Sequence, residues 1–149
     1  FADSGYFGVK ASRQLPADGA PTFVSLTADR LAPWGESEVL DPSATLAVTT
    51  FPVWNAGRQA FPLMITVGAG SHVRDFGTEP GAFAGIGMGL TEAFGVSIAH
   101  NGDNVDLGGS IRIPGVDNFG LDVTLNDAFD MDDRQRVTLS LTWVIDDVF

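Results

Sequence analysis

Apolar residues recur at every second position in segments spread along the whole chain, whereas the 3.6-residue period of an amphipathic helix is nearly absent. This alternation is typical of β-strands with one apolar face. It predicts an all-β protein. Nine segments carry the pattern: residues 6–13, 22–31, 44–51, 62–73, 82–90, 94–101, 104–113, 119–126 and 136–145.

The lengths of the turns between these segments predict how the strands pair. Apolar residues of neighbouring strands must share a face, so each turn needs the right number of residues. In the second half every turn meets this condition and predicts one meander. The expected partners are Met88 with Val96, Ile98 with Leu107, Ile111 with Leu121, and Val123 with Leu139. The same pairing places five apolar residues at one end of the sheet: Leu90, Phe94, Ile113, Phe119 and Trp143.

The face opposite the apolar one consists mainly of small residues. Ser and Thr occur there with Gly68, Gly70, Gly85, Gly87, Gly89, Gly95, Gly108 and Gly120. A soluble sheet normally exposes Lys, Glu and Arg on its outer face. Small side chains are instead favoured where a narrow barrel curves inward. The pattern therefore favours a barrel with an apolar outside and a small, polar inside.

Length and composition narrow the classes further. The chain of 149 residues fits one domain, residues 1–149, and 44% of it is hydrophobic. No apolar run approaches the roughly 18 to 20 residues that a membrane-spanning helix needs, so any membrane crossing would use strands. The chain begins at Phe1 without a methionine or a basic leader, which suggests that a signal peptide has been removed.

Charge excludes one class of partner. Nineteen acidic and eight basic residues give a net charge of -11, and Lys10 is the single lysine. Such a chain repels nucleic acid. Cysteine is absent, so the sequence supplies neither disulfides nor thiolate ligands for zinc.

With these features the chain resembles the small outer-membrane β-barrels of Gram-negative bacteria. Those barrels commonly end in a strand that finishes with phenylalanine, as this chain does at Phe149, although Asp147 on the same face departs from the pattern. The resemblance implies a closed, antiparallel up-and-down transmembrane barrel of about eight strands in the bacterial outer membrane. Its expected partners are the lipid bilayer and other proteins of the cell envelope. Because such barrels have even strand numbers, nine segments imply that one early segment is not a strand or that the chain is incomplete.

The resemblance also implies an orientation. The last strand of such barrels runs toward the periplasm, which would put the short loops at residues 91–93 and 114–118 on that side. The opposite, extracellular side would carry residues 31–43, residues 74–81, the turn at Asn101 and the acidic loop at residues 127–133.

Charged residues within the strands all fall on the small, polar face, and in a barrel they would point into the lumen: Lys10, Asp29, Asp106, Arg112 and Asp122. The expected pairing sets Ser110 opposite Asp122 and makes Arg112 the diagonal neighbour of Asp122, within reach of a charge-assisted hydrogen bond. We expect this pair to neutralise buried charge rather than to gate or select ions.

One loop gathers four carboxylates, from Asp127, Asp130, Asp132 and Asp133. Clustered oxygen ligands are what calcium needs, but the spacing matches no EF-hand, because the glycine and the closing glutamate are missing. A solvated acidic loop is favoured over a calcium site, and no other cofactor is expected.

Enzymatic activity is not expected. A Ser-His-Asp hydrolase would have to use His72 or His100, the only histidines, and no nucleophile motif accompanies either. The sequence predicts a barrel with a structural or narrow-pore role, which could be one component of an envelope complex. The alternative is a soluble β-barrel or sandwich that binds an apolar ligand or a protein partner.

Overall fold

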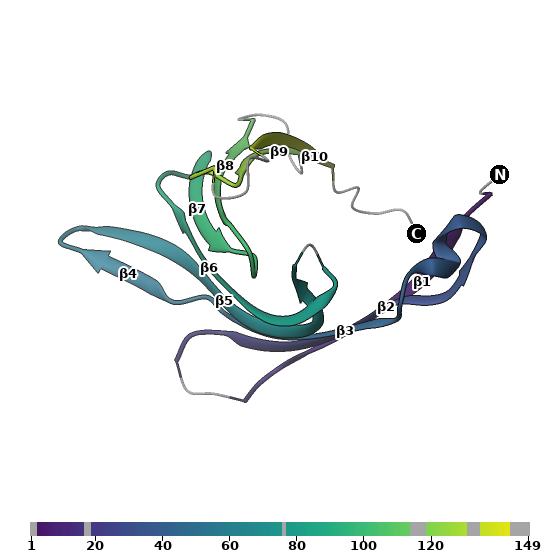
Figure 1. Ribbon diagram of the computed structural model, residues 1–149. Helices are drawn as coiled ribbons and strands as arrows, with labels where there is room; N and C mark the ends of the chain where they lie inside the picture. The colour runs from purple at the N-terminus through teal and green to yellow at the C-terminus, as the bar shows by residue number, and fades with distance from the viewer. Residues whose placement is uncertain (1–2, 17–18, 76, 114–118, 131–134, 144–149) are drawn as a thin grey trace.

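The computed structural model describes residues 3–16, 19–75, 77–113, 119–130 and 135–143 (Figure 1). These residues form strands and one short helical segment, the 3-10 helix η1 (Gly35–Val39). The strands are β1 (Gly5–Gln14), β2 (Thr22–Trp34), β3 (Ser43–Thr50), β4 (Val53–Ala56), β5 (Gln59–Arg74), β6 (Glu79–Gly89), β7 (Phe94–His100), β8 (Val105–Arg112), β9 (Phe119–Asn126) and β10 (Arg136–Trp143).

The strands form one antiparallel sheet in the order β1-β2-β3-β5-β6-β7-β8-β9-β10, with β4 paired to β5 alone. All nine expected segments are strands, so the all-β prediction is confirmed. The expectation of about eight strands is wrong, because none of the nine drops out and β4 is added. Proline has no N–H for a ladder hydrogen bond, and Pro52 separates β3 from β4. Beyond it the chain pairs again, and β4 and β5 form a hairpin around Gly57, whose φ is 66°.

The predicted pairing of the second half is confirmed. Met88 lies opposite Val96, Ile98 opposite Leu107, Ile111 opposite Leu121, and Val123 opposite Leu139. Apolar side chains of successive strands therefore share one face of the sheet. The five apolar residues expected at one end of the sheet do lie there, where β6, β8 and β10 end and β7 and β9 begin.

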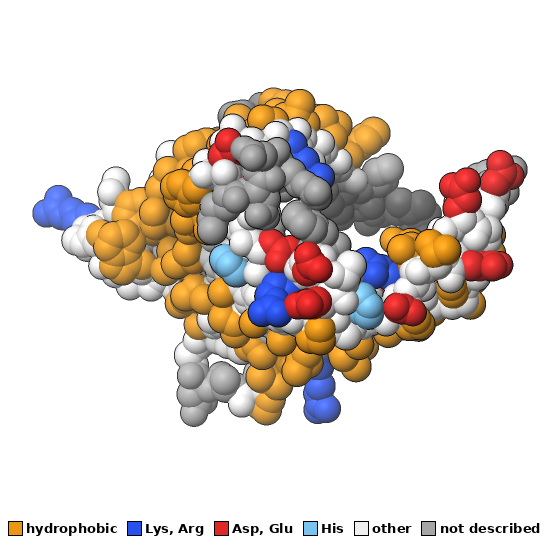
Figure 2. All heavy atoms as spheres, viewed as in Figure 1, with side chains coloured by type: hydrophobic (Ala, Val, Ile, Leu, Met, Phe, Trp, Pro, Cys, Tyr) orange, Lys and Arg blue, Asp and Glu red, His pale blue; other side chains and the backbone are white. Residues whose placement is uncertain are grey.

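The sheet curls between β5 and β10 into a trough, while β1 and β2 extend away from it (Figure 1). No ladder joins β1 to β10 in the part of the chain that is described, so the sheet is open there and the expected barrel closure is not seen. The small, polar face lines the hollow of the trough. Hydrophobic side chains occupy much of its outer margin, whereas charged side chains gather near the middle of the view (Figure 2).

Glycines on the inner face, which have no side chain, allow this curvature. A Cβ added to Gly95 would lie 2.6 Å from the hydroxyl of Ser110, and one added to Gly108 would collide with the hydroxyl of Ser97. The ring of Phe83 similarly occupies the space above Gly68. The glycines therefore give cross-strand neighbours room on the concave side, as the sequence pattern suggested.

Among the described residues, no second layer covers the apolar face. None of the described hydrophobic side chains is buried, and many large ones on this face are exposed, including Leu26, Leu46 and Ile98. The accessible surface is 10,644 Å², whereas a compact monomer of this mass would expose about 7,300 Å². The chain alone therefore leaves its main apolar surface uncovered.

Among the described residues, no helix is both long and apolar enough to cross a membrane.

Candidate functional site

The hollow of the trough is the first candidate site. It contains a cavity of about 400 Å³ bordered by β6, β7, β8 and β9, with Phe51 and Met64 at its margin. Glycines and hydroxyl residues line it together with apolar residues of β5 to β9. The polar side chains that line it are Ser97, Ser110, Arg112, Asp122 and Thr124.

The pairing of the strands places all five predicted lumen charges on the small, polar face. Lys10 lies opposite Thr27, Asp29 opposite Ser43, Asp106 opposite Ala99, Arg112 opposite Gly120, and Asp122 opposite both Ser110 and Ser140. Only two of them come together in the cavity, Arg112 and Asp122. Lys10 and Asp29 belong to the part of the sheet that extends away from the trough.

The expected hydrogen bond between Arg112 and Asp122 is not formed in the described structure. Diagonal neighbours on one face of a sheet lie about 7 to 8 Å apart, so contact depends on the arginine side chain folding toward the carboxylate. The ion pair that the described residues do form joins Arg74 to Glu79 at the β5–β6 turn, with 2.6 Å between Nη2 and Oε2. Arg112 and Asp122 are thus separate charges on the wall of the cavity.

Asp106 has a different environment from the other predicted lumen charges. Its two carboxylate oxygens accept hydrogen bonds, at 3.1 Å each, from the side-chain amide of Asn101 and the backbone N–H of Asp127. It therefore ties the β7–β8 turn to the end of β9.

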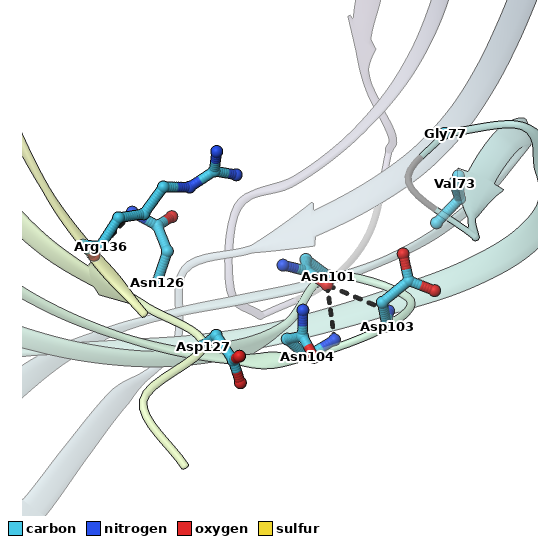
Figure 3. Close-up of a pocket in the computed structure, with 8 residues that line it drawn as sticks. All are labelled: Val73, Gly77, Asn101, Asp103, Asn104, Asn126, Asp127 and Arg136. Atoms are coloured by element: carbon cyan, nitrogen blue, oxygen red, sulfur yellow. Dashed lines mark hydrogen bonds between the residues drawn. The ribbon is translucent and has the colours of Figure 1, made fainter. Parts of the chain in front are cut away.

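A polar pocket at this end of the sheet is the second candidate site (Figure 3). Its volume is about 410 Å³, and it is lined by Val73, Gly77, Asn101, Asp103, Asn104, Asn126, Asp127 and Arg136. The β7–β8 turn contributes three of these residues. Within that turn, the side-chain oxygen of Asn101 accepts the backbone N–H groups of Asp103 at 3.0 Å and Asn104 at 2.9 Å.

Two residues of the polar pocket are buried, and both are polar. Asp127 is 2% exposed and Asn104 is 8% exposed. The Oδ1 atom of Asn104 has no hydrogen-bond partner in the described structure. Buried polar atoms are nearly always paired, so an unpaired acceptor calls for an explanation.

The predicted solvated acidic loop is therefore wrong at its first residue. Asp127 is buried. Its backbone N–H donates to the carboxylate of Asp106, and the N–H of Ala128 donates to the carbonyl of Val105 at 2.8 Å. These two hydrogen bonds hold the segment against the start of β8. Asp130 is exposed as expected, and Asp132 and Asp133 lie outside the described residues. In the described part of the chain, no three His, Cys, Asp or Glu side chains gather as metal ligands would.

Asn104 was missed by the sequence analysis. Its neighbours Asn101, Gly102 and Asp103 mark a turn, and an Asn three residues after another Asn fits a turn closed by side-chain hydrogen bonds. The burial of its amide has no such local signal, because β9 reaches this turn only through long-range pairing.

The histidines form no catalytic triad among the described residues. His72 Nδ1 lies 2.8 Å from the hydroxyl of Ser71, which also accepts the backbone N–H of Ala44. His100 Nδ1 accepts the N–H of Gly102 at 3.2 Å. Neither ring donates a hydrogen bond to a carboxylate in the described structure.

Comparisons with protein-family models, curated proteins and solved structures gave no match.

Proposed function

We propose that this chain is a small β-barrel of the bacterial outer membrane, with a structural or narrow-pore role that it could perform within an envelope complex. The observation that carries the proposal is the absence of any buried hydrophobic side chain among the described residues, together with an apolar face on the outside of a curled sheet. Water disfavours such a surface, whereas hydrocarbon accepts it at no cost.

The exposed area favours a lipid belt over a protein partner of standard size. The chain exposes 10,644 Å², which exceeds the compact expectation by roughly 3,300 Å². This excess includes the hollow of the open trough as well as the apolar outside. A standard protein interface buries about 1,600 Å² from both partners together, or about 800 Å² from each, whereas a lipid belt would cover the whole outside of a barrel.

Strand lengths suit a membrane crossing in the first part of the sheet. A strand tilted by about 45° needs about 9 to 11 residues to cross the hydrocarbon core. Strands β1, β2, β5 and β6 reach this length with 10, 13, 16 and 11 residues, whereas β7 has seven residues and β8, β9 and β10 have eight each. Phe94 and Trp143 lie at one end of the sheet, and Phe7 and Trp34 pack at the other with ring centres 5.5 Å apart. Two aromatic levels are typical of barrels that meet two membrane surfaces.

The proposal includes closure of the sheet in the membrane. Unpaired N–H and C=O groups of β1 and β10 would be too costly in hydrocarbon. Nine strands alternate along the pairing order, so β1 and β10 run in the same direction. A closing ladder between them would therefore be parallel, a pattern that is slightly less stable than an antiparallel one.

The interior suits a narrow passage or none. The cavity wall carries one positive and one negative side chain, Arg112 and Asp122. If the barrel conducts ions, Asp122→Asn should shift its selectivity toward anions and Arg112→Gln should shift it toward cations in planar-bilayer recordings. If the wild-type protein shows no conductance in these recordings, the structural role is favoured.

The decisive experiment compares folding with and without detergent. Circular dichroism and gel mobility before and after boiling would be measured for the purified chain. We expect a β-rich species that needs detergent or lipid and whose mobility changes on heating. A monodisperse, folded monomer in plain buffer would refute the membrane proposal. It would favour instead a soluble protein whose apolar face binds an apolar ligand or a partner.

A further inference from the structure

We propose that the hairpin of β4 and the start of β5, residues 53–62, lies flat on the membrane surface and binds anionic phospholipid headgroups through Arg58. This hairpin is called the β4–β5 ribbon below. The inference rests on the proposed membrane location and adds a specific lipid contact to it. The rings of Trp54 and Phe61 enter the boundary between headgroups and acyl chains.

The β4–β5 ribbon projects beyond the rest of the sheet. Strand β5 pairs with β6 only from Leu63 onward, so β4 is the one strand beside residues 59–62 in the described structure. At about 3.4 Å per residue this part of β5 extends roughly 14 Å past the ladder with β6. In Figure 1 the ribbon leaves the wall of the trough outward, away from the hollow. Two paired strands alone are at best marginally stable in water, so the ribbon needs a surface to lie on.

An aromatic pair continues the apolar outside of the sheet onto the ribbon. Trp54 lies opposite Phe61, with ring centres 5.7 Å apart. Alternation along β5 puts Phe61 on the same face as Leu63, and Leu63 lies opposite Met88 of the outer apolar face. Trp54 is 53% exposed. The ring pair is therefore an extension of the surface that the proposed barrel turns toward lipid.

The outward direction of the ribbon decides which of its faces meets the membrane. A ribbon that bends outward at the end of a barrel keeps its outer face toward the bilayer, so the ring pair faces the lipid. The opposite face carries the pair Val53 and Pro62 next to the sheet and the pair Asn55 and Ala60 nearer the tip. Tryptophan is enriched where membrane meets water because its ring is apolar and its N–H is polar.

The charge of the ribbon suits an anionic partner. Arg58 lies in the two-residue turn at its tip, is exposed, and makes no ion pair with any described residue. No acidic residue occurs between Asp41 and Asp75, although the chain as a whole has a net charge of -11. Glu92 lines a gap of about 320 Å³ beside the ribbon, and Arg58 does not. At the left of Figure 2 the projection carries basic and hydrophobic side chains together.

The combination of groups identifies a phospholipid rather than a free phosphate. A guanidinium donates a pair of parallel hydrogen bonds to phosphate oxygens. Aromatic rings beside it have no use for a small soluble anion, but they fit the acyl boundary directly beneath a headgroup. The acidic remainder of the chain repels anionic lipid, so the contact is confined to the ribbon.

Tryptophan quenching by brominated phospholipids in vesicles tests the contact. Of the three tryptophans, Trp34 and Trp143 are replaced by Phe in the full chain, so that Trp54 alone emits. A companion variant keeps only Trp143 and reports on insertion of the sheet. We expect bromines near the headgroup to quench Trp54 about twofold more than bromines near the chain end, as for rings at the interface.

The two variants separate the inference from the proposed function. If Trp143 is quenched and Trp54 is not, the sheet is in the membrane and the ribbon does not lie on its surface, which refutes the inference alone. If neither is quenched, the membrane location fails and the inference fails with it. If the double replacement does not fold, the quenching lost between the wild type and Trp54→Phe gives the same answer.

The preference for anionic lipid is measured with the variant that keeps only Trp54. Brominated phosphatidylglycerol and brominated phosphatidylcholine are compared as minor components of the same vesicles. We expect roughly fivefold enrichment of the anionic lipid around Trp54, the effect of one basic residue at a charged surface. Arg58→Gln should abolish it, whereas the control Lys10→Gln, which removes the same charge from the small, polar face of β1, should retain it.

Two results would overturn the headgroup contact. A preference that survives Arg58→Gln, or that Lys10→Gln removes equally, would show that Arg58 binds no headgroup. Shielding of Trp54 from brominated lipid and from aqueous acrylamide alike would show that protein covers the ribbon, as expected if a second copy paired with the free edge of β4.

Discussion

Ile98 lies in the middle of β7 on the apolar face, between Ile86 of β6 and Leu107 of β8. We predict that Ile98→Arg strongly destabilises the protein in lipid. The side chain is 43% exposed, which corresponds to roughly 80 Å² and to about 2 kcal/mol of lost transfer free energy at about 25 cal/mol per Å². Desolvation of the guanidinium adds to this loss. The total should approach the about 2 to 4 kcal/mol measured for arginine at the midplane of outer-membrane barrels.

The matched control is Val39→Arg. Val39 belongs to η1, outside the sheet, and is 84% exposed. The same chemical change there should alter the free energy of unfolding by no more than about 0.5 kcal/mol, as for ordinary surface positions. The difference between the two variants therefore isolates the contact of the outer face with lipid from the effect of adding a positive charge.

The assay is reversible denaturant unfolding in phospholipid vesicles, followed by tryptophan fluorescence and by gel mobility. Ile98→Arg should reduce the folding equilibrium constant roughly 30- to 700-fold, since each 1.4 kcal/mol is a factor of ten. If Ile98→Arg costs no more than Val39→Arg, the outer face does not contact hydrocarbon. The membrane proposal would then be abandoned.

Two further predictions test the inner face and the ends of the sheet. Gly108→Ala should destabilise the fold by about 1 kcal/mol because of crowding, and Ser97→Gly should restore part of the loss. Gly109→Ala should be close to neutral, because its added Cβ would meet nothing nearer than 4.0 Å; equal costs at the two glycines would contradict the assignment of faces. Variants that retain only Trp143 or only Trp34 should be quenched by lipids brominated near the headgroup more than by lipids brominated near the chain end. Stronger quenching by lipids brominated near the chain end would show that Trp143 or Trp34 does not lie at a membrane surface.

Strand positions and most of their pairing could be predicted from the sequence. The alternation in residues 94–101, for example, is local, and a two-residue turn at Gly102 and Asp103 leaves one pairing that keeps apolar residues on one face. The candidate sites were less predictable. The face of Arg112 and Asp122 followed from alternation, but their lack of contact depends on side-chain direction, which the pattern does not specify.

The sequence by itself determined the all-β class, the nine main strands and the division into an apolar and a small, polar face, because each depends on neighbours along the chain. Only the tertiary structure decided that β4 pairs beyond Pro52 and that the sheet curls around its glycine face. It also decided that Asn104 and Asp127 are buried together. These features arise where segments distant in sequence approach each other, and long-range packing rather than local periodicity sets that approach.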